Sequence, residues 1–237
     1  MTASVLLRLE GPLQSWGTRS RFPERDTETE PSKSGVLGLV GAALGMSRDN
    51  DALLERLAAC RLAVRVDQEG KLLRDYHTVG GGTFRGEPHG VFDAKGTVLT
   101  SRHYLQSASF IVALGYEDGA LAARIDGALG APKWPLALGR RACAPSLPVR
   151  AGLVSAPPEE AVREAPWLSA KRPRQPLRLI VECDPGESGA EPRQDHPLSF
   201  RLHHRHYARR FVRTTFVDPA VLTVAPEEAP CISLVAF

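Results

Sequence analysis

Apolar and polar residues alternate along several short segments of the chain, and each alternation predicts a strand. In residues 4–10, Val5, Leu7 and Leu9 fall on one face, and Leu6, Arg8 and Glu10 fall on the other. Further strands are predicted over 62–67, from 71 toward Val79, and over 109–116, which is the most apolar of them. Helices are predicted over 33–45, 51–60 and 119–129. This order favours an α+β domain of the ferredoxin-like or RRM-like kind.

Glycine and proline divide the rest of the chain. Residues 11–32 form a long predicted loop, and residues 80–102 are glycine-rich and mostly polar, which favours a projecting β-hairpin arm. Prolines between 157 and 176 mark a change of composition, after which short strands are predicted over 177–183, 198–203, 211–217 and 232–237. We therefore expect one domain over 1–150, with its arm at 80–102, and a smaller antiparallel β domain over 151–237.

Composition excludes several classes of protein. The 237 residues are 43% hydrophobic with a net charge of +3, so the chain can bury a core. The longest apolar stretch, residues 35–46, is about half of the roughly 20 residues that a membrane-spanning helix needs. Since Arg8 and Glu10 also interrupt any signal-peptide core, we expect a cytoplasmic protein without membrane contact. We read the cysteines as reduced, mostly buried thiols that bind no metal: Cys60, Cys143, Cys183 and Cys231.

The charges are distributed unevenly along the chain. Two windows without acidic residues, 127–158 and 196–217, together hold nine arginine and lysine residues. Arginine outnumbers lysine 25 to 5, and arginine suits bidentate phosphate contacts and stacking on bases. Codon usage would also raise the arginine content, but it does not explain the clustering. The windows predict positive faces on a nearly neutral protein.

The predicted helix at 33–45 has glycines at 35, 38, 41 and 45, which share one face. Each costs roughly 1 kcal/mol relative to alanine, so something must approach that face closely. One interpretation is tight packing on a sheet. The other is that the start of the helix, at Lys33 and Ser34, receives a phosphate on its free N–H groups.

Two segments carry candidate chemistry near the predicted loop and arm. In the loop, an amide, an indole and arginines could bind a base edge, stack a base and neutralise phosphates: Gln14, Trp16, Arg19, Arg21 and Arg25. The other interpretation is that Trp16 fills the core beneath the loop. At one root of the arm, Tyr76 and His77 could perform acid–base chemistry on an RNA 2′-hydroxyl, or serve as structural or stacking residues. Candidate RNA contacts at the other root are Arg102 and Tyr104.

Two further basic segments lie later in the chain. The first, L-G-R-R at 138–141, contains Arg140 and Arg141. In the second, at 203–213, Arg205, Tyr207 and Arg209 would share a strand face, which is typical of sequence-tolerant binding to single strands. The neighbouring histidines have no carboxylate closer in sequence than Asp195 and Asp218, so we expect neither a metal site nor any cofactor.

Taken together, these segments resemble the CasD family, the subunit of the type I-E CRISPR Cascade complex that holds the 5′ handle of the CRISPR RNA. The matching stretches are R-L-E-G-P-L-Q-S-W-G (8–17), S-R-F (20–22), P-S-K-S-G-V-L-G-L-V-G-A-A-L-G (31–45), R-D-Y-H-T-V (74–79), Y-L-Q-S-A-S-F-I-V-A-L (104–114) and L-G-R-R-A-C (138–143). They cover the first 143 residues in the order of the family.

The resemblance implies an RRM-like domain whose arm, called the thumb, displaces one nucleotide at the handle boundary. It implies a non-catalytic, RNA-binding subunit in antiviral defence that caps the filament of backbone subunits beside the large subunit. Target DNA would be met only through the complex. A relative in another subtype is a metal-independent endoribonuclease that processes repeat RNA. That activity is the alternative, with Tyr76 and His77 as its first candidates.

Overall fold

The computed structural model describes residues 2–18, 24–79, 82–84, 87–89, 98–167 and 175–223, and it shows a mixed α+β fold. The strands are β1 (Ala3–Glu10), β2 (Leu13–Gln14), β3 (Glu24–Arg25), β4 (Arg61–Gln68), β5 (Lys71–Val79), β6 (Gly82–Phe84), β7 (Glu87–His89), β8 (Val98–Gln106), β9 (Ser109–Tyr116), β10 (Arg150–Val154), β11 (Leu177–Cys183), β12 (Glu191–Ser199) and β13 (His206–Val217). The helices are α1 (Lys33–Leu44), α2 (Asp51–Ala58), α3 (Gly119–Gly130), α4 (Pro158–Glu164) and the short 3₁₀ helix η1 (Pro219–Val221).

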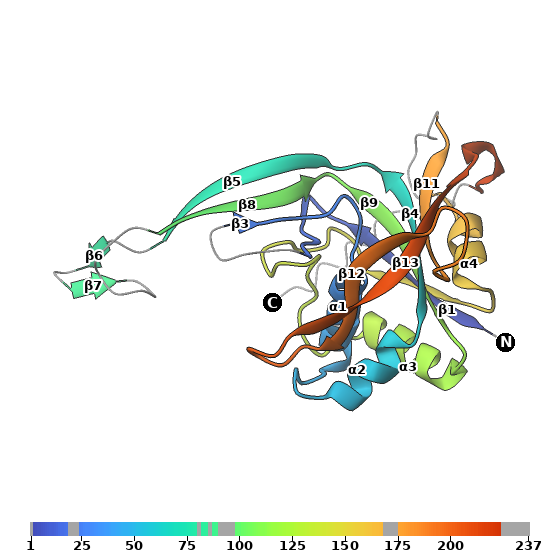
Figure 1. The fold of residues 1–237 in the computed structure, drawn as a ribbon, viewed down its shortest axis with the longest axis horizontal. Coiled ribbons are helices and arrows are strands. Elements are labelled where there is room, and N and C mark those ends of the chain that lie inside the picture. The colour runs from blue at the N-terminus through green and yellow to red at the C-terminus, as the bar shows by residue number, and fades with distance from the viewer. Residues whose placement is uncertain are drawn as a thin grey trace, which may run out of the picture.

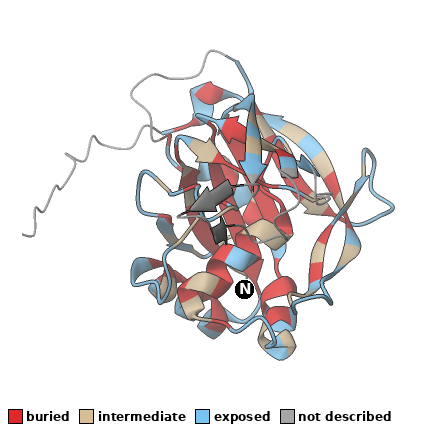
Figure 2. Cartoon of the chain, turned by 90° about the vertical axis from the view of Figure 1, so that its left-hand side faces the viewer, coloured by how far each residue is buried: buried red, intermediate tan, exposed pale blue. Residues whose placement is uncertain are grey.

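A seven-stranded antiparallel sheet forms the centre of the molecule, in the order β10-β1-β9-β4-β11-β13-β12. Helices α1, α2 and α3 pack on one face, and α4 packs on the other (Figure 1). The alternation in β1 follows from these two layers: Val5, Leu7 and Leu9 join the core under α1, whereas Leu6 joins the core under α4. Buried residues are accordingly concentrated on the strands and on the inward helix faces (Figure 2).

The first helix forms as its sequence predicts. Ser32 is the N-cap, and its hydroxyl accepts a hydrogen bond from the Gly35 N–H. The helix ends at Leu44 because Gly45 adopts a left-handed conformation, with φ of 67°. Among the described residues, no helix is long and apolar enough to span a membrane. The three described cysteines, Cys60, Cys143 and Cys183, are free and buried, as expected; Cys231 lies outside the described residues.

The C-terminal third differs from the prediction in its elements. The predicted strand at 198–203 is mostly the turn between β12 and β13, and the structure adds β10 and α4. Strands β11, β13 and β12 continue the central sheet through the pairing of β11 with β4, so they do not form a sheet of their own. The division into domains at residue 150 stays a prediction. The predicted strand at 232–237 lies outside the described residues.

A second sheet consists of β8 paired with β5 on one side and with the short strands β2 and β3 on the other. Its long strands β5 and β8 extend from the body of the molecule as a ribbon, with β6 and β7 at the far end (Figure 1). The ribbon begins at Lys71 and Gln106, so it is longer than the predicted arm at 80–102. Of that arm, residues 80–81, 85–86 and 90–97 lie outside the described residues. Leu72, Tyr76 and Leu99 are exposed on the ribbon, and the strand register places them on one face.

Candidate nucleic-acid interface

A cleft of about 830 Å³ lies beside α1. Its walls come from the loop after β2, residues 25–26 at the end of β3, the segment 134–141 and the hairpin of β12 and β13. The described residues that line it include five arginines and a single aspartate: Arg25, Asp26, Arg48, Arg140, Arg141 and Arg205. Parts of the chain that are far apart in sequence therefore build one surface with an excess of positive charge.

The glycine face of α1 borders this cleft instead of packing on the sheet. Val36, Leu37 and Val40, on the other side of the helix, lie in the core. The Trp16 ring comes within 2.8 Å of where a Cβ of Gly35 would lie, and the Met46 methyl approaches Gly41 equally closely. The prediction of tight sheet packing at these glycines is therefore wrong, because their close neighbours are side chains at the edge of a cleft.

The N-terminus of α1 does not offer a phosphate site at Lys33. This residue is only 1% exposed, and its Nζ donates to the Cys60 carbonyl at 2.6 Å and to a Glu182 carboxylate oxygen at 2.9 Å. Its backbone N–H donates to Asp195 Oδ2 at 2.7 Å. Because the chain itself occupies these donors, the predicted phosphate contact of Lys33 is wrong. Ser34, one residue later, is half-buried and lines the cleft.

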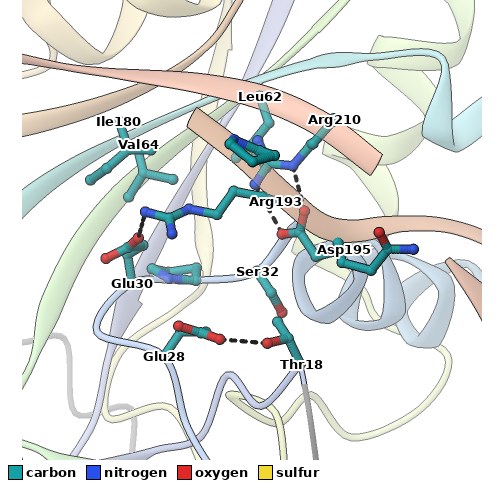
Figure 3. A pocket seen from close by; sticks show the side chains of 13 residues that line it. Thr18, Glu28, Glu30, Ser32, Leu62, Val64, Ile180, Arg193, Asp195 and Arg210 are labelled. Carbon is teal, nitrogen blue, oxygen red and sulfur yellow. Dashed lines mark hydrogen bonds and ion pairs between the residues drawn. The ribbon is translucent and has the colours of Figure 1, made fainter. Parts of the chain in front are cut away.

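Asp195 and Arg210 complete a buried group of charges beneath the helix start (Figure 3). Arg210 donates to both carboxylate oxygens of Asp195, at 2.6 and 2.9 Å. Burial alone would raise the pKa of Asp195, but the hydrogen bonds and charge of Arg210, helped by Lys33, outweigh it and hold this pKa below its ordinary value. The group joins α1 to the C-terminal strands.

The same close-up shows a smaller pocket of about 50 Å³, which shares Thr18, Ser32 and Gln194 with the cleft (Figure 3). Its charged side chains have partners within the chain. Arg193 pairs with Glu30 at 3.4 Å, and Glu28 accepts a hydrogen bond from Thr18. The pocket therefore provides little free charge for an external ligand.

Gln14 and Trp16 are structural. Gln14 is fully buried, and its amide nitrogen donates to the Leu9 and Ala108 carbonyls at 3.1 and 2.7 Å. Its amide oxygen accepts from Trp16 Nε1 at 3.0 Å. The prediction that these side chains contact bases is wrong for this fold, since both are buried and already paired. The interpretation of Trp16 as a core plug is correct.

Arg140 connects the root of the ribbon with the walls of the cleft. It donates to the backbone carbonyls of His103, Arg25 and Asp26 at 2.8–3.0 Å, and its guanidinium carbon lies 4.7 Å from the centroid of the Tyr104 ring. Tyr104 is buried. Arg140 therefore positions the ribbon instead of serving as a free phosphate ligand. Tyr104 was predicted to lie near a base or at the hinge of the arm, and the structure places it at the root of the ribbon. The preceding residue must be glycine, since Gly139 has φ of 91° and a Cβ there would lie 1.7 Å from the Ser15 carbonyl oxygen.

Arg141 and Arg205 are predicted arginines that remain available in the cleft. Both are exposed and line the cleft, and neither has an ion-pair partner in the described part of the chain. Tyr207 is half-buried and lines the cleft beside them. Arg209 is exposed on β13 but does not line the cleft. Arg19 and Arg21 lie outside the described residues.

Tyr76, His77 and Arg102 lie on the ribbon. Tyr76 is 62% exposed, and His77 Nδ1 lies 3.0 Å from Asp75 Oδ2. Arg102 is half-buried on β8, opposite Asp75. Because successive strand residues point to opposite faces, Tyr76 and His77 are poorly placed to act together on one RNA 2′-hydroxyl.

Sequence reasoning missed two residues that line the cleft: Arg48 is exposed there, and Trp134 is 45% exposed. Arg25, which belongs to the basic positions predicted for the loop, is also exposed in the cleft. Sequence reasoning also overestimated how much free positive charge the two windows without acidic residues provide. Four of their arginines pair with carboxylates from other parts of the chain: Arg150 with Asp126, Arg201 with Asp51, Arg210 with Asp195, and Arg213 with Glu159. The positive surface is therefore smaller than the windows suggest.

Known proteins with similar sequences and structures identify the family. Residues 4–213 match the family described as CRISPR-associated protein (Cas_Cas5). The chain belongs to this family. It is 36% identical over 167 residues to the CRISPR system Cascade subunit CasD of Escherichia coli (strain K12), an alignment covering 66% of this chain and 73% of that protein.

Two solved structures extend the Cas5 likeness over nearly the whole fold. One is described as the crystal structure of a Cas protein, with a TM-score of 0.74 and 38% identity, covering 94% of this chain and 99% of that one. The other is a chain from a CRISPR RNA-guided surveillance complex, with a TM-score of 0.74 and 37% identity, covering 94% of each chain. The similarity therefore includes the C-terminal strands, which lie beyond the matching stretches in the first 143 residues.

Proposed function

We propose that this chain is a non-catalytic Cascade subunit that holds the 5′ handle of a CRISPR RNA in the cleft beside α1. The cleft carries the proposal: Arg141 and Arg205 are exposed in it without ion-pair partners among the described residues, and Arg25 and Arg48 add positive charge. Arginine suits phosphate contacts, and a groove of positive charge can follow a single-stranded backbone. The relatives in Cascade and in the RNA-guided surveillance complex support the same assignment.

The strand order supports an RRM-like interpretation of the first part of the chain. Strands β10, β1, β9 and β4 are neighbours in the sheet, and they follow the chain order β1-α1-β4-β9-α3-β10 of a ferredoxin-like unit. The ribbon of β5 and β8 is inserted in the chain between β4 and β9, which are neighbours in the sheet. We interpret it as the thumb of the family.

The thumb would contact RNA and the neighbouring backbone subunit, and the chain would cap the backbone filament beside the large subunit. Leu72, Tyr76 and Leu99, exposed on one face of the ribbon, are suited to a protein contact. Target DNA would be met only through the assembled complex. This placement favours a cytoplasmic ribonucleoprotein in antiviral defence.

Co-expression with the other Cascade subunits and a CRISPR RNA tests the proposal. After ultraviolet crosslinking, the purified complex should yield handle nucleotides attached to the segment 134–141 and to the β12–β13 hairpin. The double variant Arg141→Ala/Arg205→Ala should lose most of this crosslink. Arg124→Ala is a suitable control, because Arg124 is exposed on α3 and does not line the cleft. Crosslinks confined to other surfaces would contradict the proposal.

Incubation of the purified chain with repeat RNA in EDTA tests the absence of catalysis. We expect binding without cleavage, because Tyr76 and His77 lie on opposite faces of β5. A handle-length product that disappears in His77→Ala would establish the endoribonuclease instead.

A further inference from the structure

Gly38 is the exposed glycine in the middle of α1. Contacts within the chain explain why two neighbouring positions are glycine, since Trp16 leaves no room for a Cβ at Gly35 and Met46 leaves none at Gly41. By contrast, a Cβ at Gly38 would meet no described atom within 4 Å. Glycine disfavours the helix relative to alanine. The position therefore lowers the stability of α1 without an internal packing reason, and it leaves the backbone of the helix open to the cleft.

Trp134 lies on the wall of the same cleft and is 45% exposed. Its backbone N–H donates to the Ala42 carbonyl at 3.2 Å, and the N–H of Lys133 donates to the Ala43 carbonyl at 2.9 Å. Ala42 follows Gly38 by four residues, so it lies about one helical turn away on the same face. The chain thus fixes a large, accessible aromatic residue close to the open glycine.

The surrounding charge indicates what such a site would bind. Arg141 and Arg205 are exposed in the cleft without ion-pair partners among the described residues. A flat apolar surface beside cations suits a nucleotide, because bases stack on aromatic side chains while arginines contact phosphates. An aliphatic protein segment would leave the arginines without a negative partner. An acidic segment would pair with the arginines but would not cover the aromatic surface. The cleft volume of about 830 Å³ is ample for a nucleotide.

We propose that Gly38 and Trp134 form a slot for one unstacked nucleobase of the bound RNA, which stacks on Trp134 and lies against the bare backbone at Gly38. The phosphates on either side of this base contact Arg141 and Arg205. This inference rests on the proposed function, and it adds a base-holding element to the electrostatic contacts. Since every base has a flat face, the slot tolerates sequence changes.

Substitution of Gly38 tests the slot through two opposite effects. In Gly38→Ala, the midpoint of thermal unfolding should rise by about 2–4 °C because alanine favours the helix. The affinity for a fluorescent single-stranded RNA of the handle sequence, measured by anisotropy, should fall about fivefold, and further in Gly38→Leu. Gly127 in α3 is the matched control, since it is also exposed and a Cβ there would meet no described atom within 4 Å. Gly127→Ala should raise the midpoint equally and leave the affinity unchanged.

Substitution of Trp134 tests the stacking contact. Trp134→Ala should weaken binding about tenfold, whereas Trp134→Phe should keep most of the affinity. RNA should also quench tryptophan fluorescence in the unsubstituted chain and not in Trp134→Phe, because Trp16 and Trp167 are buried.

The results separate the slot from the proposed function. If Arg141→Ala/Arg205→Ala loses RNA binding while Gly38→Leu and Trp134→Ala bind normally, the slot is disproved and the proposed function stands. If the unsubstituted chain binds no handle RNA, alone or in the assembled complex, both are disproved. Equal losses in Gly38→Ala and Gly127→Ala would also exclude the slot, since the effect would not depend on the cleft.

Discussion

Lys33 carries a positive charge in the helix that borders the cleft, yet its contacts make it a structural residue. Its ammonium group is held by Glu182 and the Cys60 carbonyl in a buried site. Removing one partner of a buried ion pair leaves the other charge uncompensated, which costs about 3–5 kcal/mol. We therefore expect Lys33→Met to lower the free energy of unfolding by about 3 kcal/mol, as measured by urea denaturation.

The double variant Lys33→Met/Glu182→Gln is the control for this prediction, since it removes both charges together. It should recover part of the lost stability. A Lys33→Met variant that keeps its full stability but binds RNA weakly would instead restore the phosphate role.

The contacts of Lys33 illustrate which site residues can be identified from the sequence alone. Ser32 caps α1 through the N–H of Gly35, only three residues away, so a local pattern is enough to suggest such a cap. The partners of Lys33 lie 27 and 149 residues away, so no local pattern distinguishes a buried lysine from a phosphate ligand. Trp134 escaped notice for the same reason, because its exposure depends on how the segment 134–141 lies over α1.

At the scale of elements, the strands with a regular alternation or a continuous apolar run were predictable and β12 was not. Strand β9 was expected with its observed bounds, because both its faces are buried and its sequence is almost entirely apolar. β12 is an edge strand with two prolines and many polar residues, so it lacks the alternation that marks a strand. Its place is fixed instead by pairing with β13 and by the ion pair between Asp195 and Arg210.

This ion pair makes the junction of α1 with β12 and β13 sensitive to acid. The pKa of Asp195 is lower in the folded chain than its ordinary value. Its contribution to stability is therefore present above about pH 3.9, the unfolded value, and is lost as the pH falls through the folded pKa. We expect the free energy of unfolding, measured in urea between pH 6 and pH 3, to fall less steeply below about pH 4 in Asp195→Asn than in the unsubstituted chain. Parallel curves for the two proteins would show that Asp195 does not contribute.

The ribbon of β5 and β8 carries an element-scale prediction about assembly. Leu72 and Tyr76 are 67% and 62% exposed, so Leu72→Ser/Tyr76→Ser should leave the thermal midpoint of the isolated chain nearly unchanged. If this face contacts a backbone subunit, the variant should lose affinity for the complex by about tenfold or more, because apolar area is left unburied. Size-exclusion chromatography of co-expressed subunits measures the loss. Val221, exposed in η1 after β13, supplies the control Val221→Ser.

At the scale of the whole molecule, ion pairing decides how much of the positive charge can act on RNA. Many arginines are neutralised by distant carboxylates, and Arg140 is held by backbone carbonyls. Exposed arginines without such partners in the described ranges remain around the cleft and on β13: Arg25, Arg48, Arg141, Arg205 and Arg209. The net charge of +3 therefore understates the local field at the cleft.

About five phosphate contacts fix the salt dependence of RNA binding. For single strands, the logarithm of the association constant plotted against the logarithm of the salt concentration should have a slope of about −3.5. The affinity should therefore fall about a hundredfold between roughly 50 and 200 mM salt. Removing two contacts in Arg141→Ala/Arg205→Ala should make the slope shallower by about 1.4, whereas Arg124→Ala should leave it unchanged. Filter binding of handle RNA across a salt series measures these slopes. Because stacking on Trp134 adds no phosphate contact, Trp134→Ala should weaken binding at every salt concentration with the slope preserved. A flat salt response would mean that the arginines of the cleft do not contact the RNA backbone.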